Sequence, residues 1–160
     1  MTTVRKAKNI DIPKIAKAAV QLLMYHAKLD PYFSPSQDAE EIYKKYFRRC
    51  IYSRKRELLV AEYEGEFAGY ANIELASRPP VLKIRNMGVV NDIFVIEKFR
   101  KNGISKELFL GMLDWMKSKK KSCESLEYIE LSVNMEDPVS QKVWAKYGFK
   151  EYMSKQRMKI

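Results

Sequence analysis

Cysteine is scarce in this sequence, and long apolar runs are missing. Cys50 and Cys123 are the two cysteines, and their spacing suits neither a metal site nor a disulfide framework, so we expect no metal and a reducing, cytoplasmic setting. The most apolar helical stretch, residues 15–24, is interrupted by a lysine and a glutamine, which argues against a membrane-spanning helix. Residues 1–14 include basic side chains but lack the apolar core of a secretory signal. The sequence therefore predicts a protein without disulfides or membrane segments.

Internal repeats and low-complexity tracts are also missing. Hydrophobic residues make up 46% and charged residues 31% of the 160 residues, which is ordinary for a globular protein. A chain of this length matches one compact domain with a sizeable core. We therefore expect a single domain over residues 1–160.

Positive charge dominates the composition and is unevenly distributed. The net charge is +10, from 30 lysines and arginines against 20 acidic residues, and such a balance favours polyanionic partners. Residues 100–121 hold seven basic and two acidic side chains, whereas residues 29–43 hold four acidic side chains and no lysine or arginine. We expect a polyanion to bind near the first region and a cation near the second.

Hydrophobic periodicity predicts strands and helices in the order β-α-α-β-β-β-α-β-α-β. Asp11 has the character of a helix N-cap, and Glu64-Gly65-Glu66 has that of a hairpin turn. Helices mixed with strands around a long central strand favour one α/β sheet covered on both faces. The predicted strands cover residues 3–7, 58–64, 67–75, 82–96, 128–133 and 149–160, and the predicted helices cover residues 12–29, 38–51, 104–118 and 138–147.

The segment between the 82–96 strand and the 104–118 helix has the features of a phosphate-binding turn. The N–H groups of residues 102–106 start a helix and lack acceptors within it, Arg100 and Lys101 add positive charge, and Gly103 lets a ligand approach the backbone. Neither G-x-x-x-x-G-K nor G-x-G-x-x-G is present, which excludes a Walker loop and a dinucleotide fingerprint. On these features alone, a basic strand-to-helix turn without a ligand is the alternative.

Three motifs resemble those of the GNAT superfamily of N-acetyltransferases. Residues 100–105, Arg-Lys-Asn-Gly-Ile-Ser, resemble its R/Q-x-x-G-x-G/A signature, although Ser105 replaces the usual last glycine or alanine. Residues 92–95, Asp-Ile-Phe-Val, are similar to the cofactor strand of the family, and residues 137–140 with 144–149 resemble its N-x-x-A/S and Y-x-k-x-G-F block. The resemblance covers nearly the whole chain and implies the α/β GNAT acyl-CoA N-acyltransferase fold, with a mixed central sheet.

The resemblance also implies acetyl-CoA as the co-substrate. Main-chain groups of Ile93 and Val95 would pair with the amides of the pantetheine arm, and the N–H of Phe94 or Val95 would stabilise the oxyanion. Asp137 and Ser140 would lie near the pantetheine or the phosphates. The turn would hold the pyrophosphate through the charge of Arg100 and the main-chain N–H groups of Lys101, Asn102, Gly103, Ile104 and Ser105.

Acetyl transfer to an amine needs a proton acceptor, because an alkylamine with a pKa of about 10.4 is almost fully protonated at neutral pH. Asp92 is the first candidate for this base, since it lies on the strand that the resemblance places beside the thioester. A structural hydrogen-bonding role is the alternative for Asp92. His26, the single histidine, is a second candidate on the expected acceptor side, with packing in the core as its alternative.

At the position that would protonate the leaving thiolate, this sequence departs from the family pattern. Many members have a tyrosine as general acid where this sequence has Trp144, whose indole does not protonate a thiolate. A thiol pKa of about 8.5 lets the thiolate leave without full protonation. Tyr147 or water would then supply the proton, and a merely packed Tyr147 is the alternative.

Two features bear on the acceptor. Asn91-Asp92 resembles the acidic pair of the diamine acetyltransferases, which favours a small alkylamine or polyamine over the main alternative, a protein N-terminus or lysine. The four acidic residues between positions 29 and 43 would draw in a cation, or would compensate a helix dipole. They are Asp30, Asp38, Glu40 and Glu41.

Two other classes of function compete with acetyl transfer. A basic nucleic-acid-binding module is disfavoured, because the helix within residues 100–121 lacks aromatic side chains interleaved with its basic face. A CoA-binding relative without catalysis is the other alternative. The family resemblance leaves a homodimer open as the assembly.

Overall fold

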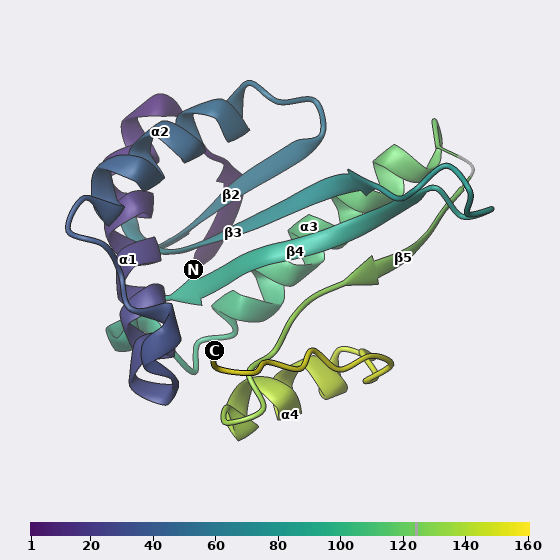
Figure 1. Ribbon diagram of the computed structural model, residues 1–160. Coiled ribbons are helices and arrows are strands. Elements are labelled where there is room, and N and C mark those ends of the chain that lie inside the picture. The colour runs from purple at the N-terminus through teal and green to yellow at the C-terminus, as the bar shows by residue number, and fades with distance from the viewer. Residues whose placement is uncertain (124) are drawn as a thin grey trace.

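The computed structural model describes residues 1–123 and 125–160 and folds them into a five-stranded sheet with four α-helices (Figure 1). The strands are β1 (Thr2–Lys6), β2 (Arg56–Tyr63), β3 (Glu66–Ser77), β4 (Asn86–Val95) and β5 (Leu126–Glu130). The helices are α1 (Ile12–Leu29), α2 (Ala39–Ile51), α3 (Ile104–Lys120) and α4 (Pro138–Lys146), with short 3₁₀ helices η1 (Asn9–Asp11), η2 (Pro31–Phe33) and η3 (Glu97–Phe99). None of the described helices combines the length and the hydrophobicity that a membrane span requires.

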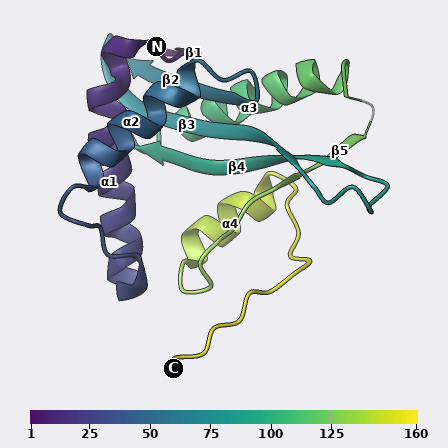
Figure 2. The ribbon, with the colours of Figure 1, turned by 45° about the horizontal axis from the view of Figure 1, so that its top comes forward.

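The strands follow one another across the sheet in the order β1-β2-β3-β4-β5 (Figure 2). Neighbours from β1 to β4 are antiparallel, whereas β4 and β5 are parallel, so the sheet is mixed as predicted. The predicted turn joins β2 to β3, with φ of +52° at Glu64 and +83° at Gly65. Positive φ at both central residues is typical of a type I′ hairpin turn, whose twist matches that of the two strands.

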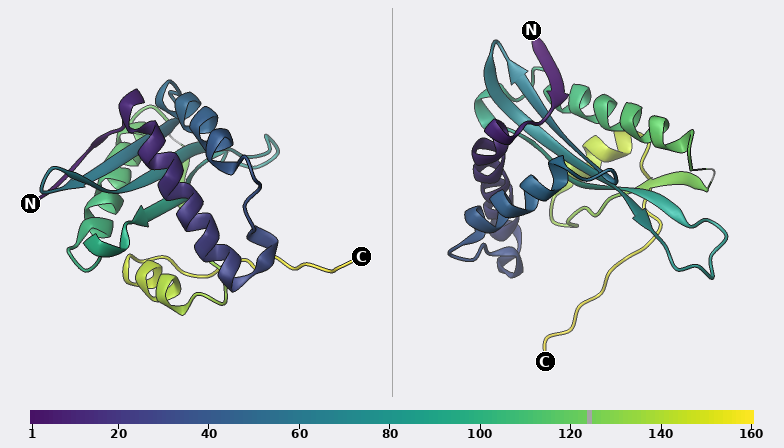
Figure 3. Two further views of the ribbon diagram at one scale, coloured as in Figure 1. Left: turned by 90° about the vertical axis from the view of Figure 1, so that its left-hand side faces the viewer. Right: turned by 90° about the horizontal axis from the view of Figure 1, so that it is seen from above.

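Alternation along the strands divides the core into two apolar layers (Figure 3). On β2, Leu58 and Val60 pack beneath α1 and α2, whereas Leu59 and Ala61 pack against α3 on the opposite face. β3 and β4 are central strands, so their side chains reach both layers. Fully buried residues of the helices include Ile15, Ala16, Phe47, Ile104, Leu108 and Met112.

The structure differs from the prediction in the last strand. Residues 149–160, called the C-terminal segment below, follow α4 without helix or strand, and their side chains are largely exposed. Their apolar residues, such as Tyr152, Met153 and Met158, fall on both faces of an extended chain, so no single face is available for burial. Local composition favours an extended backbone here, but it does not supply the neighbouring strand that a ladder requires.

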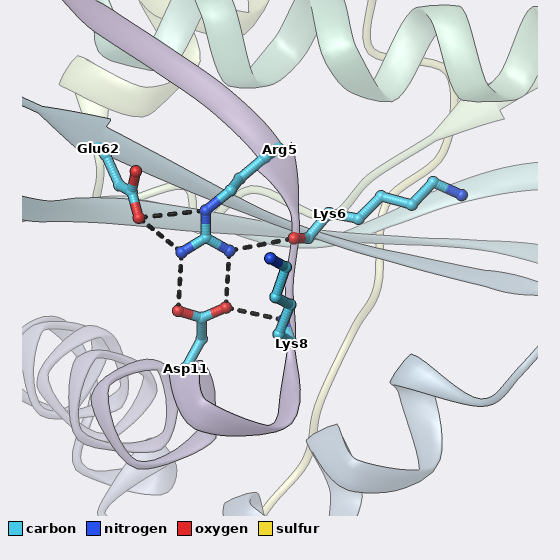
Figure 4. Close-up of polar contacts among 5 residues, drawn as sticks. All are labelled: Arg5, Lys6, Lys8, Asp11 and Glu62. Carbon is cyan, nitrogen blue, oxygen red and sulfur yellow. Dashed lines mark hydrogen bonds and ion pairs between the residues drawn. The ribbon is translucent and has the colours of Figure 1, made fainter. Parts of the chain in front are cut away.

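Arg5 of β1 links the edge of the sheet to the start of α1 (Figure 4). Its guanidinium donates to both carboxylate oxygens of Asp11, at 2.8 and 2.9 Å, and to Oε1 of Glu62 on β2, at 2.5 and 3.1 Å. The Lys8 N–H donates to Asp11 at 2.7 Å. The hydrogen bonds from Arg5 hold the pKa of the buried Asp11 carboxyl below its usual value. Asp11 occupies the predicted N-cap position of α1, but its side chain makes no capping hydrogen bond to that helix and instead binds Arg5 of β1 and the Lys8 N–H.

An Asp11→Asn variant is expected to lose about 1–3 kcal/mol of unfolding free energy at pH 7, the usual scale for hydrogen bonds between charged groups. Because the pKa of Asp11 is lowered in the folded state, this stabilisation is present at neutral pH and is lost as the pH falls below the ordinary carboxyl value and through the lowered one. Urea unfolding of parent and variant at neutral and acidic pH measures both effects.

The matched control is Asp114→Asn on α3, whose exposed carboxylate lies 4.0 Å from Lys117. Exposed ion pairs contribute little to stability, so this variant should unfold close to the parent. Equal losses in the two variants, or a loss in Asp11→Asn that persists unchanged at acidic pH, would contradict the assigned role of the Arg5 contacts.

Candidate functional site

The edge of β4 that faces β5 is open over its second half. β5 pairs with residues 86–89 of β4, and beyond them the two strands diverge (Figure 1). On the other side, the Ile96 N–H donates to the Ala68 carbonyl at 2.9 Å. This hydrogen bond shows which residues of β4 direct their peptide groups toward β3. Because hydrogen-bonded and non-hydrogen-bonded pairs alternate in an antiparallel ladder, the N–H and C=O groups of Ile93 and Val95 face away from β3. They present strand-type donors and acceptors at the open edge.

The turn after β4 presents a cluster of N–H groups without protein acceptors. Lys101 and Gly103 have left-handed backbones, with φ of +67° and +77°, and α3 begins directly after them. Within the described chain, the N–H groups of residues 101–105 donate to no protein acceptor, whereas those of Lys106 and Glu107 donate to the Gly103 carbonyl at 3.0 and 3.2 Å. The Lys106 N–H, which was predicted to be one of the free donors of the turn, is therefore already paired within the protein. The remaining donors and the helix dipole form an anion-binding concavity.

Side chains around this turn hold its shape and add positive charge. The Arg100 Nε donates to the Val95 carbonyl at 3.2 Å, and its guanidinium carbon lies 5.9 Å from the ring centre of Phe94. The Asn102 side-chain amide donates to the Phe99 carbonyl at 3.1 Å. The exposed Arg100 thus lies along the open edge of β4, where its charge is available to an anion.

Tyr147, at the end of α4, reaches the first turn of α3. Its hydroxyl lies 3.5 Å from Ser105 Oγ, and its ring stacks on Phe109 with the centres 4.5 Å apart. The Trp144 ring packs nearly edge-on against Phe109 and Tyr147, with ring centres 6.0 and 5.9 Å apart, respectively. The ring of Tyr147 is therefore packed, while its hydroxyl reaches the anion-binding turn.

Asp137 and Ser140 meet at the start of α4. The buried Asp137 carboxylate accepts hydrogen bonds from the Ser140 N–H at 3.1 Å and from the Ser140 hydroxyl at 2.6 Å. Burial alone would raise the pKa of Asp137, but the hydrogen bonds from Ser140, together with the effects of Tyr25 and His26, outweigh it and the pKa is lowered. Asp137 is thus the N-cap of α4, and the Ser140 hydroxyl proton is committed to it.

His26 lies near Asp137 and outside the core. The buried residues of α1 all belong to its first half, because its last turns extend beyond the sheet (Figure 2). The imidazole is half-buried with its centre 6.1 Å from the ring centre of Phe33, which corrects the core interpretation of this histidine. Burial lowers the pKa of His26, and the Asp137 carboxylate opposes that shift. In the described residues, no group of three or more His, Cys, Asp or Glu is arranged to hold a metal ion.

Asp92 lies among phenol hydroxyls and a buried amide. It is directly opposite Asn72 of β3, and the extra residue of a β-bulge, Asn91, precedes it. Burial raises the pKa of Asp92 to about 6, although the polar groups of Asn72 and Tyr70 oppose the rise. The Tyr70 hydroxyl and Asn72 Oδ1 are buried and have no hydrogen-bond partner in the described chain. A carboxylate with a raised pKa beside unpaired polar groups is typical of a reaction site.

A pocket opens between the end of α1, η2 and α2, next to these groups. Apolar and aromatic side chains line most of it, including Leu23, Phe33, Ile42 and Tyr43. Burial raises the pKa of the Tyr43 phenol, and the Asp92 carboxylate raises it further, so Tyr43 connects the pocket to Asp92. Tyr43 thus belongs both to the lining of the pocket and to the surroundings of Asp92.

The surroundings of Asp92 are built from residues that show no functional pattern in the sequence. The pairing of β3 with β4 brings Asn72 opposite Asp92, and a register drawn from the two alternating strands could have found it. The Tyr46 hydroxyl accepts a hydrogen bond from the Asn72 amide at 3.0 Å. Tyr43 and Tyr46 read in the sequence as ordinary residues of an amphipathic helix, so their place near Asp92 depends on tertiary packing.

Comparisons with known proteins agree with this geometry. The model of the Acetyltransferase (GNAT) family matches residues 22–149. A mutant of the BH1408 protein from Bacillus halodurans is 20% identical, with a TM-score of 0.86 over 99% of both chains. A "predicted acetyltransferase" from Clostridium acetobutylicum, solved with acetyl-CoA, is 22% identical, with a TM-score of 0.70 over 99% of this chain and 96% of that one. No match was found among curated proteins.

A third solved structure extends the same likeness. The aminoglycoside N-acetyltransferase AAC(6')-Iy in complex with CoA is 16% identical, with a TM-score of 0.72 over 100% of this chain and 95% of that one. At these identities the structural likeness establishes a common fold, and the family model covers most of the sequence. With its mixed sheet, its open β4 edge and the donor-rich turn that follows, this chain is an N-acetyltransferase that belongs to the acetyltransferase (GNAT) family.

Proposed function

We propose that this enzyme transfers the acetyl group of acetyl-CoA to a primary amine, with a small alkylamine or polyamine as the acceptor. The observation that carries the proposal is two sets of main-chain groups without protein partners: the peptide groups of Ile93 with the Val95 N–H at the open edge, and the N–H groups of residues 101–105 at the turn. The pantetheine arm carries amides and the nucleotide end carries a pyrophosphate, so each meets matching partners in this order. Acetyl-CoA or CoA is present in two of the similar solved structures, which supports this choice of co-substrate.

The direction of the peptide groups along β4 decides between the N–H groups of Phe94 and Val95, the two donors predicted for the oxyanion. The Phe94 N–H points toward β3, because residues 94 and 96 share the same side of the ladder. The Val95 N–H faces the open edge. Val95 is therefore our choice for the donor to the negative charge that develops on the thioester oxygen, a contribution of about 3–4 kcal/mol in well-studied acyl-transfer enzymes.

Asp92 is our choice for the base that takes the proton from the acceptor. With a pKa of about 6, its carboxylate is largely ionised at neutral pH and is more basic than an ordinary aspartate. Its side chain lies with that of Phe94 on the face covered by α1 and α2, where the pocket lined by Tyr43 opens. The amine would reach Asp92 through this pocket, while the thioester would lie along the open edge of β4.

The proton for the leaving thiolate has two candidate sources. Trp144 packs among aromatic rings and donates no such proton, and the Tyr147 hydroxyl lies beside Ser105 at the turn. Because a thiol has a pKa of about 8.5, the thiolate leaves tolerably in water, and protonation by solvent is sufficient. Tyr147 or water would fill this role.

The acceptor is tested by measuring thiol release from acetyl-CoA with a panel of amines. Short alkylamines and diamines are expected to give turnover, and lysine-containing peptides and peptides with free N-termini form the other arm of the panel. Faster turnover of the peptides would replace the small amine with a protein acceptor. Binding of acetyl-CoA without thiol release from any amine would leave only the CoA-binding alternative.

A Gly103→Val variant is expected to lose binding of acetyl-CoA. At a free acetyl-CoA concentration of 100 times Kd, the parent should gain about 2.7 kcal/mol of stability, which a thermal-shift measurement detects. The valine side chain is strained at φ +77° and would extend into the open space beside the free N–H groups, where no protein atom lies within 4 Å.

Gly65→Val is the matched control, because Gly65 also has a positive φ (+83°) and no protein atom within 4 Å. It introduces the same side chain and a similar strain at the β2–β3 hairpin, away from the turn. The control should unfold earlier than the parent yet keep its full response to acetyl-CoA. An undiminished response in a folded Gly103→Val variant would show that the turn does not hold the pyrophosphate.

An Asp92→Asn variant is expected to lose about 10²–10⁴-fold in kcat/KM, because the amide keeps the size of the side chain but accepts no proton. In the parent, kcat/KM should fall as the pH drops through about 6, where the Asp92 carboxylate becomes protonated. The variant should lose this dependence and recover part of its activity at high pH, where free amine is abundant. Steady-state rates between about pH 5 and pH 10 measure each effect.

Two further measurements separate a base from a structural group at this position. Affinity for acetyl-CoA should stay near that of the parent, because that contact is assigned to main-chain groups. A rise in the KM for the amine with unchanged kcat would make Asp92 an acceptor-binding group, and kinetics identical to the parent would leave it structural. Asp114→Asn, an exposed carboxylate on α3, serves as the control for the loss of one negative charge.

A further inference from the structure

The acidic residues between α1 and α2 differ in how they are paired. Glu40 and Glu41 lie in the first turn of α2, and both pair with Lys44, at 3.1 and 2.7 Å. Asp38 accepts a hydrogen bond from the Ser36 hydroxyl at 2.8 Å. Asp30 instead pairs with a residue far along the chain. Among the four acidic residues of this region, Asp30 is therefore the one that holds a cation brought from elsewhere.

The cation held by Asp30 is the guanidinium of Arg157, from the C-terminal segment. Arg157 Nη2 lies 2.7 Å from Asp30 Oδ2, and the guanidinium carbon lies 4.7 Å from the ring centre of Tyr32. The Tyr32 N–H donates to Asp30 Oδ1 at 3.0 Å, which holds the carboxylate beside the ring. Figure 3 shows the C-terminal segment passing the lower end of α1 and the loop that follows it. A fixed carboxylate next to an aromatic face is a chemical match for an organic cation.

This cation site adjoins the pocket between α1, η2 and α2, because Tyr32 lines that pocket together with Phe33. Tyr43 also lines the pocket, and the charge of Asp92 reaches its phenol. The other side chains of the lining are largely apolar, such as Leu23 and Ile42. The apolar lining of the pocket is therefore flanked by Tyr32, which is held beside the Asp30 carboxylate, and by Tyr43, which senses the Asp92 carboxylate. This arrangement matches a linear molecule with a positive charge at each end of a hydrocarbon chain.

We propose that Asp30 and Tyr32 bind the second positive charge of a diamine or polyamine acceptor, and that Arg157 occupies this position when no acceptor is bound. This inference rests on the proposed function, because the other nitrogen of the acceptor is the one acetylated beside Asp92. A monoamine of the same length reaches Asp92 but leaves Asp30 and Tyr32 to Arg157. The site therefore selects for charge at the far end of the acceptor.

The contact of Arg157 is weak enough to be exchanged. The Arg157 side chain is 57% exposed, and the C-terminal segment around it has no helix or strand. Exposed ion pairs and exposed cation–aromatic contacts are each modest interactions that water and competing cations reduce. An acceptor cation that enters the same position makes the same contacts, and the C-terminal segment loses no ladder when it leaves.

The first test measures binding of 1,4-diaminobutane and of butylamine by titration calorimetry, with no acetyl transfer required. Arg157→Ala should tighten binding of the diamine by about two- to tenfold relative to butylamine, because the internal competitor is gone. Lys155→Ala removes a neighbouring positive charge from the same segment and is the matched control, with a diamine-to-butylamine ratio equal to that of the parent. An unchanged ratio in Arg157→Ala, or an equal rise in both variants, would overturn the assignment of Arg157.

The second test removes the carboxylate. In an Arg157→Ala background, Asp30→Asn should reduce the preference for the diamine over butylamine by a similar factor, about two- to tenfold. An unchanged preference would overturn the site, as would absence of diamine binding to every variant. Tighter binding of a lysine-containing tripeptide than of the diamine would assign the position to a protein acceptor and overturn the proposal.

These binding measurements do not depend on acetyl transfer, so they test the cation site separately from the proposed function. If no amine releases thiol from acetyl-CoA while the diamine still binds through Asp30, the proposed function fails and the cation site is retained. If diamines are acetylated but the preference ignores Asp30 and Arg157, the cation site fails and the proposed function is retained. A series of diamines of increasing length then defines the separation of the two carboxylates.

Discussion

The structure depends on one constraint: β4 continues past the point where β5 leaves it. Main-chain N–H and C=O groups have a strong requirement for hydrogen bonds, and those of Ile93 and Val95 find no strand on the outer side. Beyond η3, the turn at residues 101–105 adds a second set of N–H groups without protein acceptors at the start of α3. A ligand that supplies amides and then phosphates completes hydrogen bonds that the fold leaves open. In the proposed complex, the main chain of the sheet would set the position and the direction of acetyl-CoA before any side chain takes part.

The two faces of β4 divide the work between main chain and side chains. Ile93 and Val95 direct their side chains toward α3 and their peptide groups toward the open edge, whereas Asp92 and Phe94 point into the layer beneath α1 and α2. The bulge at Asn91 changes the register just before Asp92 and increases the local twist. In the proposed mechanism, proton transfer therefore uses a side chain on one face of β4, whereas thioester binding uses peptide groups at its open edge. The two steps take place close together but in different surroundings.

Patterns within short segments predicted most of the fold. The strand-to-helix turn, the Glu64-Gly65 hairpin and the helix at residues 104–118 follow from local spacing and from the backbone freedom of glycine, and the structure confirms them. The strand predicted at residues 149–160 required a partner strand, which no local pattern reveals. The same limit applies to the site: the sequence singled out Asp92, but its raised pKa comes from burial in the folded protein, which the polar groups of Tyr70 and Asn72 on β3 only partly oppose.

The attachment of α4 has a consequence for the dynamics of the protein. No residue of α4 is fully buried, and the helix is joined to α3 mainly through the rings of Trp144 and Tyr147 against Phe109. Local opening is easiest where few apolar contacts must break, so α4 can detach while the sheet stays intact. Its amide hydrogens then exchange with solvent well before those of β3. The cover beside Ser105 is in this sense a separate unit of stability.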